Sequence, residues 1–319
     1  MVTGGTGFVG ANLVRRLLAD GHEVHLMVRR DRRAWRLADV VQHVRCHELD
    51  FLDSGAVARV TREVRPEWMF HLAAHGAYSW QREPAPIVAT NLTALVHLID
   101  ACAKTGFESF VNIGSSSEYG YKDHPAAESE RVDPNSLYAV TKAAATHYCR
   151  LVAARDKLTI PTLRLHSVYG PYEEPNRLMP RLIAEGRRGQ RPPLASPETA
   201  RDYVYVDDVV DACLRAATTK SEEQGAIYNI GSGVQTRLRE VVAISDRVLG
   251  LHAPASWGQL GNRAWDTDIW VADIAKSELE LGWRARISVE EGFSRMVSWF
   301  REKYDDAALA AYCAESNAP

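Results

Sequence analysis

The sequence predicts an α/β fold in which a parallel sheet is wrapped by helices on both faces. Two observations support this prediction. Apolar runs of strand length alternate with amphipathic helical segments along the first half of the chain. A glycine-rich stretch also stands directly before the first helical segment. With 319 residues, 46% of them hydrophobic and 25% charged, the chain can bury a large core in one or two domains.

The N-terminal stretch VTGGTGFVG, at 2–10, begins almost at the first residue. Only Met1 and Val2 precede its glycines, whereas a strand usually has about 5 residues. Either the first strand is abnormally short or the natural start lies upstream, and the sequence leaves both open. Gly21 follows the first helical segment, where a left-handed cap is typical. The apolar face of that helix is formed by Leu13, Val14, Leu17 and Leu18.

Further strands and helices follow in alternation. Helical patterns cover about 84–104 and 136–155. The expected strands are EVHLMV (23–28), WMFHLAA (68–74), FVNIGS (110–115) and PTLRLHSVYG (161–170). Prolines cluster after about residue 166, and then AIYNIGSG, at 226–233, reads as one more strand of the first sheet. We therefore expect a first domain of 1–165 plus about 202–232, and a smaller, discontinuous second domain of about 166–201 and 233–319.

Composition excludes several classes of protein. The net charge of −3 gives no basic field that would hold nucleic acid or an anionic membrane. The five cysteines are widely spaced and form no CxxC pair, which argues against a disulfide framework or a metal site. No apolar run approaches the roughly 18 residues of a membrane span, and the N-terminus lacks the pattern of a signal peptide. We expect a soluble, cytoplasmic protein.

The glycine spacing at the N-terminus indicates a phosphate site. Gly4, Gly7 and Gly10 form a GxxGxxG pattern before an amphipathic helix. Such glycines let the backbone approach a pyrophosphate, whose charge lies at the helix N-terminus. A plain glycine-rich turn is the alternative, because the motif alone is a weak signal. Its position between a strand and a helix favours a Rossmann-type, doubly wound sheet that binds a dinucleotide.

An arginine-rich segment, VRRDRRAWR at 28–36, follows the second expected strand. A site selective for NAD usually has an acidic residue here, whereas arginine accommodates the 2′-phosphate of NADP. Arg29 and Arg30 therefore favour NADP(H), although a solvated surface loop would also explain several of these arginines. Asp50, after the third strand-like stretch, suits a contact with adenine.

The segment YAVTK places Tyr138 and Lys142 one helical turn apart and on one face. A tyrosine with a pKa near 10 exchanges protons poorly at neutral pH unless a nearby cation lowers that pKa. We expect Lys142 to be this cation and to lower the pKa by about 2. The YxxxK pattern is common in amphipathic helices, and it becomes specific through its combination with Ser115 and the glycine loop.

Together these motifs give a resemblance that covers nearly the whole chain. The sequence resembles an extended short-chain dehydrogenase/reductase of the NAD(P)-dependent nucleotide-sugar epimerase, dehydratase and reductase group, and is most similar to the 4-ketoreductases. The resemblance implies a Rossmann-type sheet, a smaller C-terminal α/β substrate domain and a homodimer. It rests on GGTGFVG (4–10), HLAA (71–74), Asn91, SSSEYG (115–120), YAVTK (138–142), SVYGP (167–171), RDYVYVDDV (201–209) and NIGSG (229–233).

The resemblance also implies roles for individual residues. Ser115 would orient the substrate oxygen, Tyr138 would exchange the proton and Lys142 would hold the nicotinamide ribose. The implied cofactor contacts come from Gly4, Gly7, Phe8, Val9, Gly10, Arg29, Arg30, Asp50, Phe51, Leu72, Ala73, Ala74, Asn91 and Lys142. The implied substrate contacts come from His75, Ser116, Ser117, Glu118, Ser167, Arg201 and Arg263.

The residues after Ser115 discriminate between reactions within the family. The dehydratases carry Asp and Glu there as an acid and base pair, and Ser116 and Ser117 can supply neither. Dehydration is therefore disfavoured, as is the decarboxylase variant that needs a glutamate at 117. Glu118 is similar to the ketoreductases but equally suits a loop acid bound to a backbone amide. Ser167 replaces the usual Asn, which puts that substrate contact in doubt.

Arginines and tryptophans complete the expected substrate half. Arg201 and Arg263 resemble the arginines that clamp a nucleotide diphosphate, because a guanidinium fork suits phosphate geometry. Each arginine alone is more often a surface residue. The remaining tryptophans are read mostly as core of the small domain: Trp257, Trp265, Trp270 and Trp283.

The sequence thus favours an NADP-dependent reductase that converts a nucleotide-diphosphate 4-keto-6-deoxy sugar to the 4-hydroxy sugar. A nucleotide-sugar epimerase acting through a transient keto intermediate is the first alternative. A non-catalytic NADP-sensing regulator is a second, against which the intact set of Ser115, Tyr138 and Lys142 argues. Reduction of a carbonyl compound without a nucleotide is opposed by Arg201 and Arg263.

Overall fold

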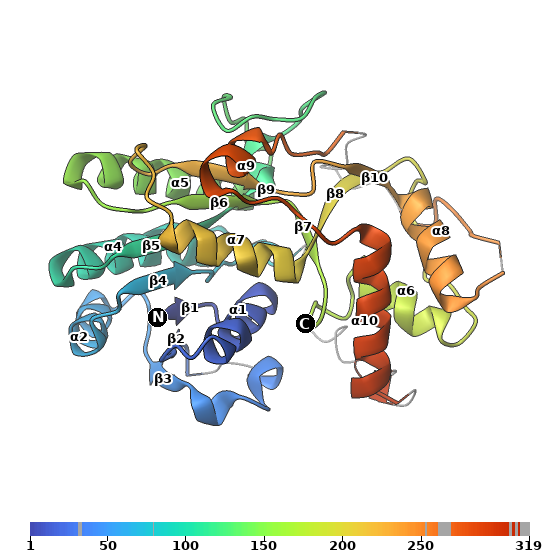
Figure 1. Ribbon diagram of the computed structural model, residues 1–319, viewed down its shortest axis with the longest axis horizontal. Helices are drawn as coiled ribbons and strands as arrows, with labels where there is room; N and C mark the ends of the chain where they lie inside the picture. The colour runs from blue at the N-terminus through green and yellow to red at the C-terminus, as the bar shows by residue number, and fades with distance from the viewer. Residues whose placement is uncertain are drawn as a thin grey trace.

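Two sheets organise the chain (Figure 1). The computed structural model describes residues 1–30, 34–78, 80–252, 254–260, 269–305, 308–309 and 312. The larger sheet is parallel throughout and has the strand order β3-β2-β1-β4-β5-β6-β9. Its strands are β1 (Val2–Thr3), β2 (His25–Val28), β3 (Arg45–Glu48), β4 (Trp68–His71), β5 (Ser109–Ser115), β6 (Thr162–Leu165) and β9 (Ile227–Ile230). The predicted doubly wound, Rossmann-type α/β class is confirmed.

The smaller sheet has the order β10-β8-β7. Its central strand β8 (Ala200–Tyr205) pairs parallel with β7 (Ser167–Tyr169) and antiparallel with β10 (Gln235–Arg237). Because β8 lies in this sheet while β9 lies in the larger one, the chain returns to the first sheet after visiting the second. The division of the chain into domains at the expected residues stays a prediction.

Helices cover both faces of the larger sheet because each turns an apolar face inward. One face carries α1 (Phe8–Ala19), α7 (Val206–Thr218) and α9 (Ala275–Leu281). The other carries α2 (Ser54–Val64), α4 (Ala94–Thr105) and α5 (Leu137–Asp156). A third core joins the smaller sheet to α6 (Leu178–Gly186), α8 (Leu238–Leu249) and α10 (Val289–Lys303).

The first strand is short and central. Val2 pairs with Leu26 of β2 on one side and with Phe70 of β4 on the other. The longer flanking strands therefore hold the glycine loop in place although β1 has only 2 residues. Gly21, just after α1, has a φ of 84°, as expected of the cap that ends this helix.

Two expected elements are divided in the structure. The run 161–170 was expected as one strand, but β6 joins the larger sheet and β7 joins the smaller one, with His166 between them. The helix expected at 84–104 begins with α3 (Pro84–Val88) and passes through a wider π-turn at Ala89–Thr93 before α4. Such turns often mark functional positions, and this one contains Asn91.

The combined helical segment Pro84–Thr105 is apolar and long enough to cross a membrane, judged by length and composition alone. A core helix of a globular protein passes the same test, and Leu95, Leu98 and Ile99 are fully buried against the sheet and α2. We therefore read the segment as a core helix.

The loop between β7 and α6 buries a carboxyl group. Glu173 is 5% exposed, and its Oε2 has no hydrogen-bond partner among the described residues. Its Oε1 lies 3.7 Å from Nε of Arg177. Burial, opposed by the charge of Arg177, raises the pKa of Glu173 to about 8.

This carboxyl group predicts a pH-dependent stability. Unfolded Glu173 ionises near pH 4.3, whereas the folded group keeps its proton until about pH 8, so the free energy of unfolding should fall as pH rises between these values. Glu173→Gln should remove this fall and be more stable than the wild type at pH 8 by about 4 kcal/mol. Urea denaturation at pH 5 and pH 8 measures the difference. Parallel pH dependences of wild type and variant would contradict the prediction.

Candidate functional site

The glycine loop forms an open cradle at the N-terminus of α1. Gly4 has a φ of 68°, and a Cβ atom there would lie 2.5 Å from the backbone nitrogen of Ala73. The N-cap residue Gly7 supplies no side-chain hydrogen bond, so the first backbone N–H groups of the helix remain able to bind an anion. These residues fit the pyrophosphate of a dinucleotide.

A cavity of about 910 Å³ adjoins this loop at the carboxyl ends of the central strands, where open α/β sheets bind ligands. Many residues expected to contact the cofactor or substrate line it. These are Gly4, Gly7, Arg29, Asp50, Phe51, Leu72, Ala73, Ala74 and His75. Burial lowers the pKa of His75, and the nearby positive charge of Arg29 lowers it further.

The sequence analysis missed Arg36 as part of this cavity. Its guanidinium is buried, and it donates from Nη2 to Oε1 of Glu174 at 2.7 Å and from Nε to the carbonyl of Tyr172 at 2.7 Å. Arg36 and Glu174 both line the cavity, as does Thr6 of the glycine loop. The ion pair thus joins the second strand's loop to the loop after β7. The arginine-rich stretch that ends at Arg36 was the available signal.

Several expected cofactor residues lie elsewhere. Phe8, Val9 and Gly10 form the first turn of α1, and Arg30 is exposed; none of the four lines the cavity. Their cofactor contacts stay predictions.

Asn91 requires a correction, because its side chain is directed into the protein. It is 2% exposed, and its Oδ1 accepts from the backbone nitrogen of His75 at 2.8 Å. Its Nδ2 donates to the carbonyl of His75 at 2.8 Å and to Oγ1 of Thr141 at 2.9 Å. With both amide protons used, Asn91 ties the loop after β4 to α5 and positions the site through those partners.

The expected catalytic residues meet at the end of β5. Ser115 is the last residue of that strand, and its hydroxyl lies close enough to the Tyr138 hydroxyl of α5 to influence the pKa of that tyrosine. Burial raises the pKa of Tyr138 to about 12, and the nearby Ser115 hydroxyl opposes that rise. The expectation that Lys142 gives Tyr138 a low pKa is therefore wrong for the protein without ligands, because desolvation dominates.

Lys142 is itself buried, one turn along α5 from Tyr138. Desolvation lowers the pKa of its ammonium group, and the carboxylate of Glu118 opposes this effect. Burial and, to a smaller extent, the charge of Lys142 lower the pKa of His71, at the end of β4, to about 3. His71 is thus neutral, and its Nδ1 lies 2.8 Å from Oγ1 of Thr3.

Glu118 is not a substrate contact, which corrects the sequence assignment. It is 0% exposed, and its Oε1 accepts from the backbone nitrogen of Ser115 at 2.9 Å and from Oγ1 of Thr146 at 3.1 Å. Its Oε2 pairs with Nε of Arg164 on β6 at 2.9 Å. The alternative of a loop acid bound to a backbone amide was the correct one. Together with the bond from the Ser117 nitrogen to the Ser115 hydroxyl, Glu118 completes a capping box.

Of the residues expected to contact substrate, Arg201 lies close to the turn after β5. The guanidinium carbon of Arg201 lies 5.0 Å from the ring centroid of Trp270, and the indole Nε1 of Trp270 donates to Oγ of Ser116 at 3.2 Å. Trp270 is therefore not core of the small domain, and Trp283 packs instead against the larger sheet. Ser117 follows in the turn Ser116–Tyr119, and Ser167 begins β7. Arg263 and Trp265 lie outside the described residues.

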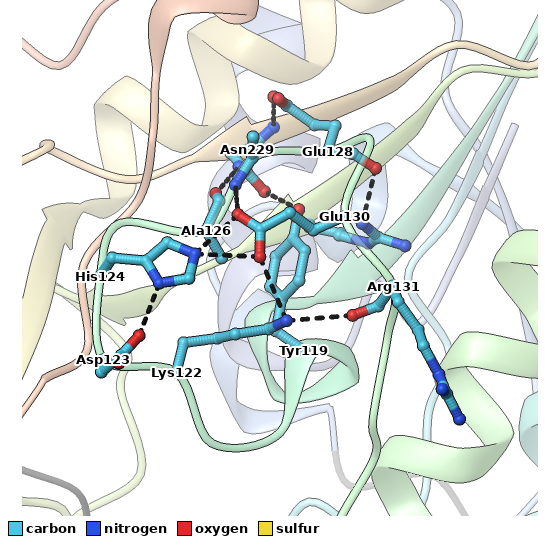
Figure 2. Close-up of polar contacts among 11 residues, drawn as sticks. Tyr119, Lys122, Asp123, His124, Ala126, Glu128, Glu130, Arg131 and Asn229 are labelled. Atoms are coloured by element: carbon cyan, nitrogen blue, oxygen red, sulfur yellow. Dashed lines mark hydrogen bonds and ion pairs between the residues drawn. The ribbon is translucent and has the colours of Figure 1, made fainter.

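A polar network behind the site connects the loop after β5 to β9 (Figure 2). Tyr119 donates to Oδ1 of Asn229 at 2.7 Å. Nδ2 of Asn229 donates to the carbonyls of Ala126 and Asp273, at 2.8 and 3.0 Å. The backbone nitrogen of Asn229 donates to Oε1 of Glu128 at 2.7 Å. The buried Asn229 thus fixes the loop that connects Ser115 to Tyr138.

The buried pair of Glu118 and Arg164 predicts a large loss of stability on neutralisation. Glu118→Gln should lower the free energy of unfolding by about 3 to 5 kcal/mol, because it leaves the Arg164 guanidinium buried without a countercharge. The matched control Glu290→Gln breaks the exposed pair with Arg247 and should have a much smaller effect, because solvent screens that pair. Urea denaturation measures both. Equal losses in the two variants would show that burial of the first pair has no energetic consequence.

Comparison with known sequences places these observations in a family. Residues 1–231 match the model of the NAD dependent epimerase/dehydratase family. A UDP-glucose 4-epimerase from Mycolicibacterium smegmatis is 31% identical, over 95% of this chain and 98% of that protein. A dTDP-glucose 4,6-dehydratase from Streptomyces griseus is 28% identical, over 95% of this chain and 94% of that protein.

Solved structures agree. A Thermotoga maritima UDP-glucose 4-epimerase with UDP-glucose has a TM-score of 0.86 at 27% identity, covering 95% of this chain and 99% of that chain. MoeE5 in complex with UDP-glucuronic acid and NAD has a TM-score of 0.83 at 30% identity, with the same coverages of 95% and 99%. With a glycine cradle, a dinucleotide-sized cavity and a Ser115–Tyr138 pair at the end of β5, the chain belongs to the NAD dependent epimerase/dehydratase family.

Proposed function

We propose that this protein is a nucleotide-sugar 4-epimerase that works with a bound nicotinamide dinucleotide. The observation that carries the proposal is the proximity of the Ser115 and Tyr138 hydroxyls, in a fold whose glycine loop lines a large cavity. Relatives named as 4-epimerases of UDP-glucose and UDP-glucuronate match over 94% or more of this chain. This reading replaces the 4-ketoreductase as the first choice.

The residues of the site suit an oxidation that is later reversed. Ser115 would hold the 4-oxygen of the sugar through its hydroxyl, and Tyr138 would take the proton from that oxygen and return it. When bound, the nicotinamide supplies reversible hydride transfer at the 4-carbon. Gly4, Gly7 and the N-terminus of α1 would hold the pyrophosphate, and Asp50 would lie near the adenosine end of the cavity.

Tyr138 needs help to act as a base, because its pKa near 12 keeps it protonated at neutral pH. Lys142 stands one turn away, and the neighbouring carboxylate of Glu118 favours its charged form. We assign to Lys142 the stabilisation of the tyrosinate that forms during turnover. Glu118 thus supports this step through Lys142, without contacting the substrate itself.

Dehydration is disfavoured for the same site. Elimination of water requires an acid and a base beside the sugar, and Ser116 and Ser117 offer only hydroxyl groups. Glu118 is the nearest carboxylate in the sequence, and both of its oxygens are already bonded, to Ser115, Thr146 and Arg164.

A second candidate is the NADPH-dependent reduction of a nucleotide-linked 4-keto-6-deoxy sugar. Arg29 favours it, because a guanidinium at the end of β2 lines the cavity where an NAD-selective site has an acid. A reductase consumes its cofactor, so selectivity for NADPH would suit net reduction. NAD is the cofactor in the solved complex of MoeE5.

We also propose a cytoplasmic homodimer. The apolar side chains of Val140 and Leu151 are exposed on α5, at 46% and 63%. They are 11 residues apart, which places them on one face three turns from each other. A second copy of the helix would cover this face.

Conversion of UDP-hexoses tests the first proposal. Purified protein should interconvert UDP-glucose or UDP-glucuronate with its 4-epimer without added NADPH. When NADPH is added, the absorbance of NADPH should not fall during the conversion. Tyr138→Phe should lower turnover by about 10²- to 10⁴-fold while the variant still binds cofactor, because only the transferable proton is lost. Rates are measured by chromatography of the nucleotide sugars.

Two other products would contradict epimerisation. Stoichiometric loss of NADPH with a 4-keto-6-deoxy nucleotide sugar would establish the reductase instead. A product lighter by one water would establish a dehydratase and would show that an acid other than the residues at 116 and 117 serves the sugar.

Cofactor choice is tested at Arg29. If its guanidinium reads a 2′-phosphate, the wild type binds NADP⁺ more tightly than NAD⁺, and Arg29→Asp loses about 1.5 to 3 kcal/mol of NADP⁺ binding. The control Arg30→Asp makes the same charge change next to it, outside the cavity lining, and should have a smaller effect. Isothermal titration measures both affinities. Equal wild-type affinities for the two cofactors would remove the support for an NADPH-dependent reductase.

A further inference from the structure

Trp270 connects two parts of the substrate site that come from different sheets. Its indole Nε1 lies 3.2 Å from Oγ of Ser116, the residue directly after Ser115 at the end of β5. The guanidinium of Arg201, on β8 of the smaller sheet, lies over its ring. The Trp270 indole thus contacts Ser116 through its edge and Arg201 through its face.

The segment that carries Trp270 is fixed from three sides. The backbone nitrogen of Trp270 donates to Oε1 of Gln235 at 3.3 Å. Two residues on, the nitrogen of Ala272 donates to Oδ2 of the fully buried Asp202 at 3.0 Å, and Ala272 forms a β-bridge with Ala126. The indole is therefore held in place before any substrate binds.

The chemistry of indole determines how Ser116 can act. An indole N–H donates a hydrogen bond and cannot accept one, so the Ser116 oxygen must be the acceptor of this pair. The hydroxyl proton of Ser116 then remains to be donated, and none of the described residues is seen to accept it. Because Ser116 directly follows Ser115, to which the proposed function assigns the substrate oxygen, its hydroxyl proton would be close to the substrate.

The face of the indole has a separate effect on Arg201. A guanidinium over a tryptophan ring is attracted to the electron density of the ring, and this attraction restricts where the Arg201 guanidinium can lie. Arg201 also donates from Nη1 to the carbonyl of Ala200 at 2.7 Å. The contact with the indole thus fixes where the Arg201 guanidinium lies relative to the end of β5.

We propose that Trp270 is a specificity-determining residue of the substrate site. Through its N–H it makes Ser116 a hydrogen-bond donor to a sugar oxygen beside the reacting carbon. Through its ring it positions Arg201 for the diphosphate. The inference rests on the proposed function, since it assigns both ends of a nucleotide-diphosphate sugar to one side chain.

Two substitutions separate these effects. Trp270→Phe removes the N–H and keeps a ring beneath Arg201, whereas Trp270→Leu removes both. Ser116→Ala removes the hydroxyl that the N–H is proposed to orient. The measurements are kcat/KM for the UDP-hexose that the wild type converts and the Kd of UDP alone by isothermal titration, with cofactor present throughout.

We expect Trp270→Phe and Ser116→Ala each to lower kcat/KM by about 3- to 10-fold, the effect of one hydrogen bond, with the Kd of UDP unchanged. The double variant with Trp270→Phe and Ser116→Ala should lose no more kcat/KM than either single variant, because both substitutions act on the same hydroxyl. Trp270→Leu should in addition weaken UDP binding by about 2- to 5-fold. A merely structural role for Trp270 would not give this non-additivity with Ser116.

Other results would overturn the inference. Wild-type kcat/KM in Trp270→Phe, or losses that multiply in the double variant, would show that Trp270 does not act through Ser116. An unchanged UDP affinity in Trp270→Leu would remove the role at Arg201. Failure of the wild type to convert any nucleotide sugar would contradict the proposed function and the inference together, whereas normal conversion with an unaffected Trp270→Phe would contradict the inference alone.

Discussion

The buried ion pair of Glu118 and Arg164 is the interaction on which the arrangement of the site depends. The carboxylate accepts from the backbone nitrogen of Ser115, holds Thr146 of α5 and pairs with Arg164 of β6. Contacts from β5, α5 and β6, which follow one another along the chain, thereby meet at one buried charge. The same charge favours the ammonium form of Lys142. A buried pair of this kind stabilises only when its remaining hydrogen bonds are satisfied, and here the neighbouring groups satisfy them.

The contacts of this ion pair continue beyond Arg164 toward β9. The guanidinium of Arg164 lies over the ring of Tyr119, 4.6 Å from its centroid, and the Tyr119 hydroxyl bonds Asn229. Asn229 then holds the carbonyl of Asp273, in the segment that carries Trp270. A continuous series of contacts thus connects Ser115 at the end of β5 to the segment that carries Trp270.

Local patterns were enough to predict much of this structure. The glycine spacing and the one-turn separation of Tyr138 and Lys142 follow from nearest neighbours along the chain. The burial of Glu118 could not be predicted, because its partner Arg164 is 46 residues away and both look like surface residues in the sequence. Trp270 was misread for the same reason, since tryptophan is typical of cores and its contacts with Ser116 and Arg201 are long-range. The pattern at 161–170 is equally apolar on both sides of His166, so it carries no sign of where the chain changes sheets.

That change of sheet has a mechanical consequence. One buried residue, His166, separates β6 from β7, and its backbone nitrogen is bonded to the carbonyl of Ile230 in β9. A connection of one residue between two hydrogen-bonded strands leaves very few soft torsions, so it acts as a rigid corner rather than as a hinge. The spacing between Ser115 at the end of β5 and Arg201 on β8 is then set largely by the backbone. If these two residues bind the two ends of a nucleotide sugar as proposed, sugars of different size must be accommodated by side chains within a gap of nearly constant width.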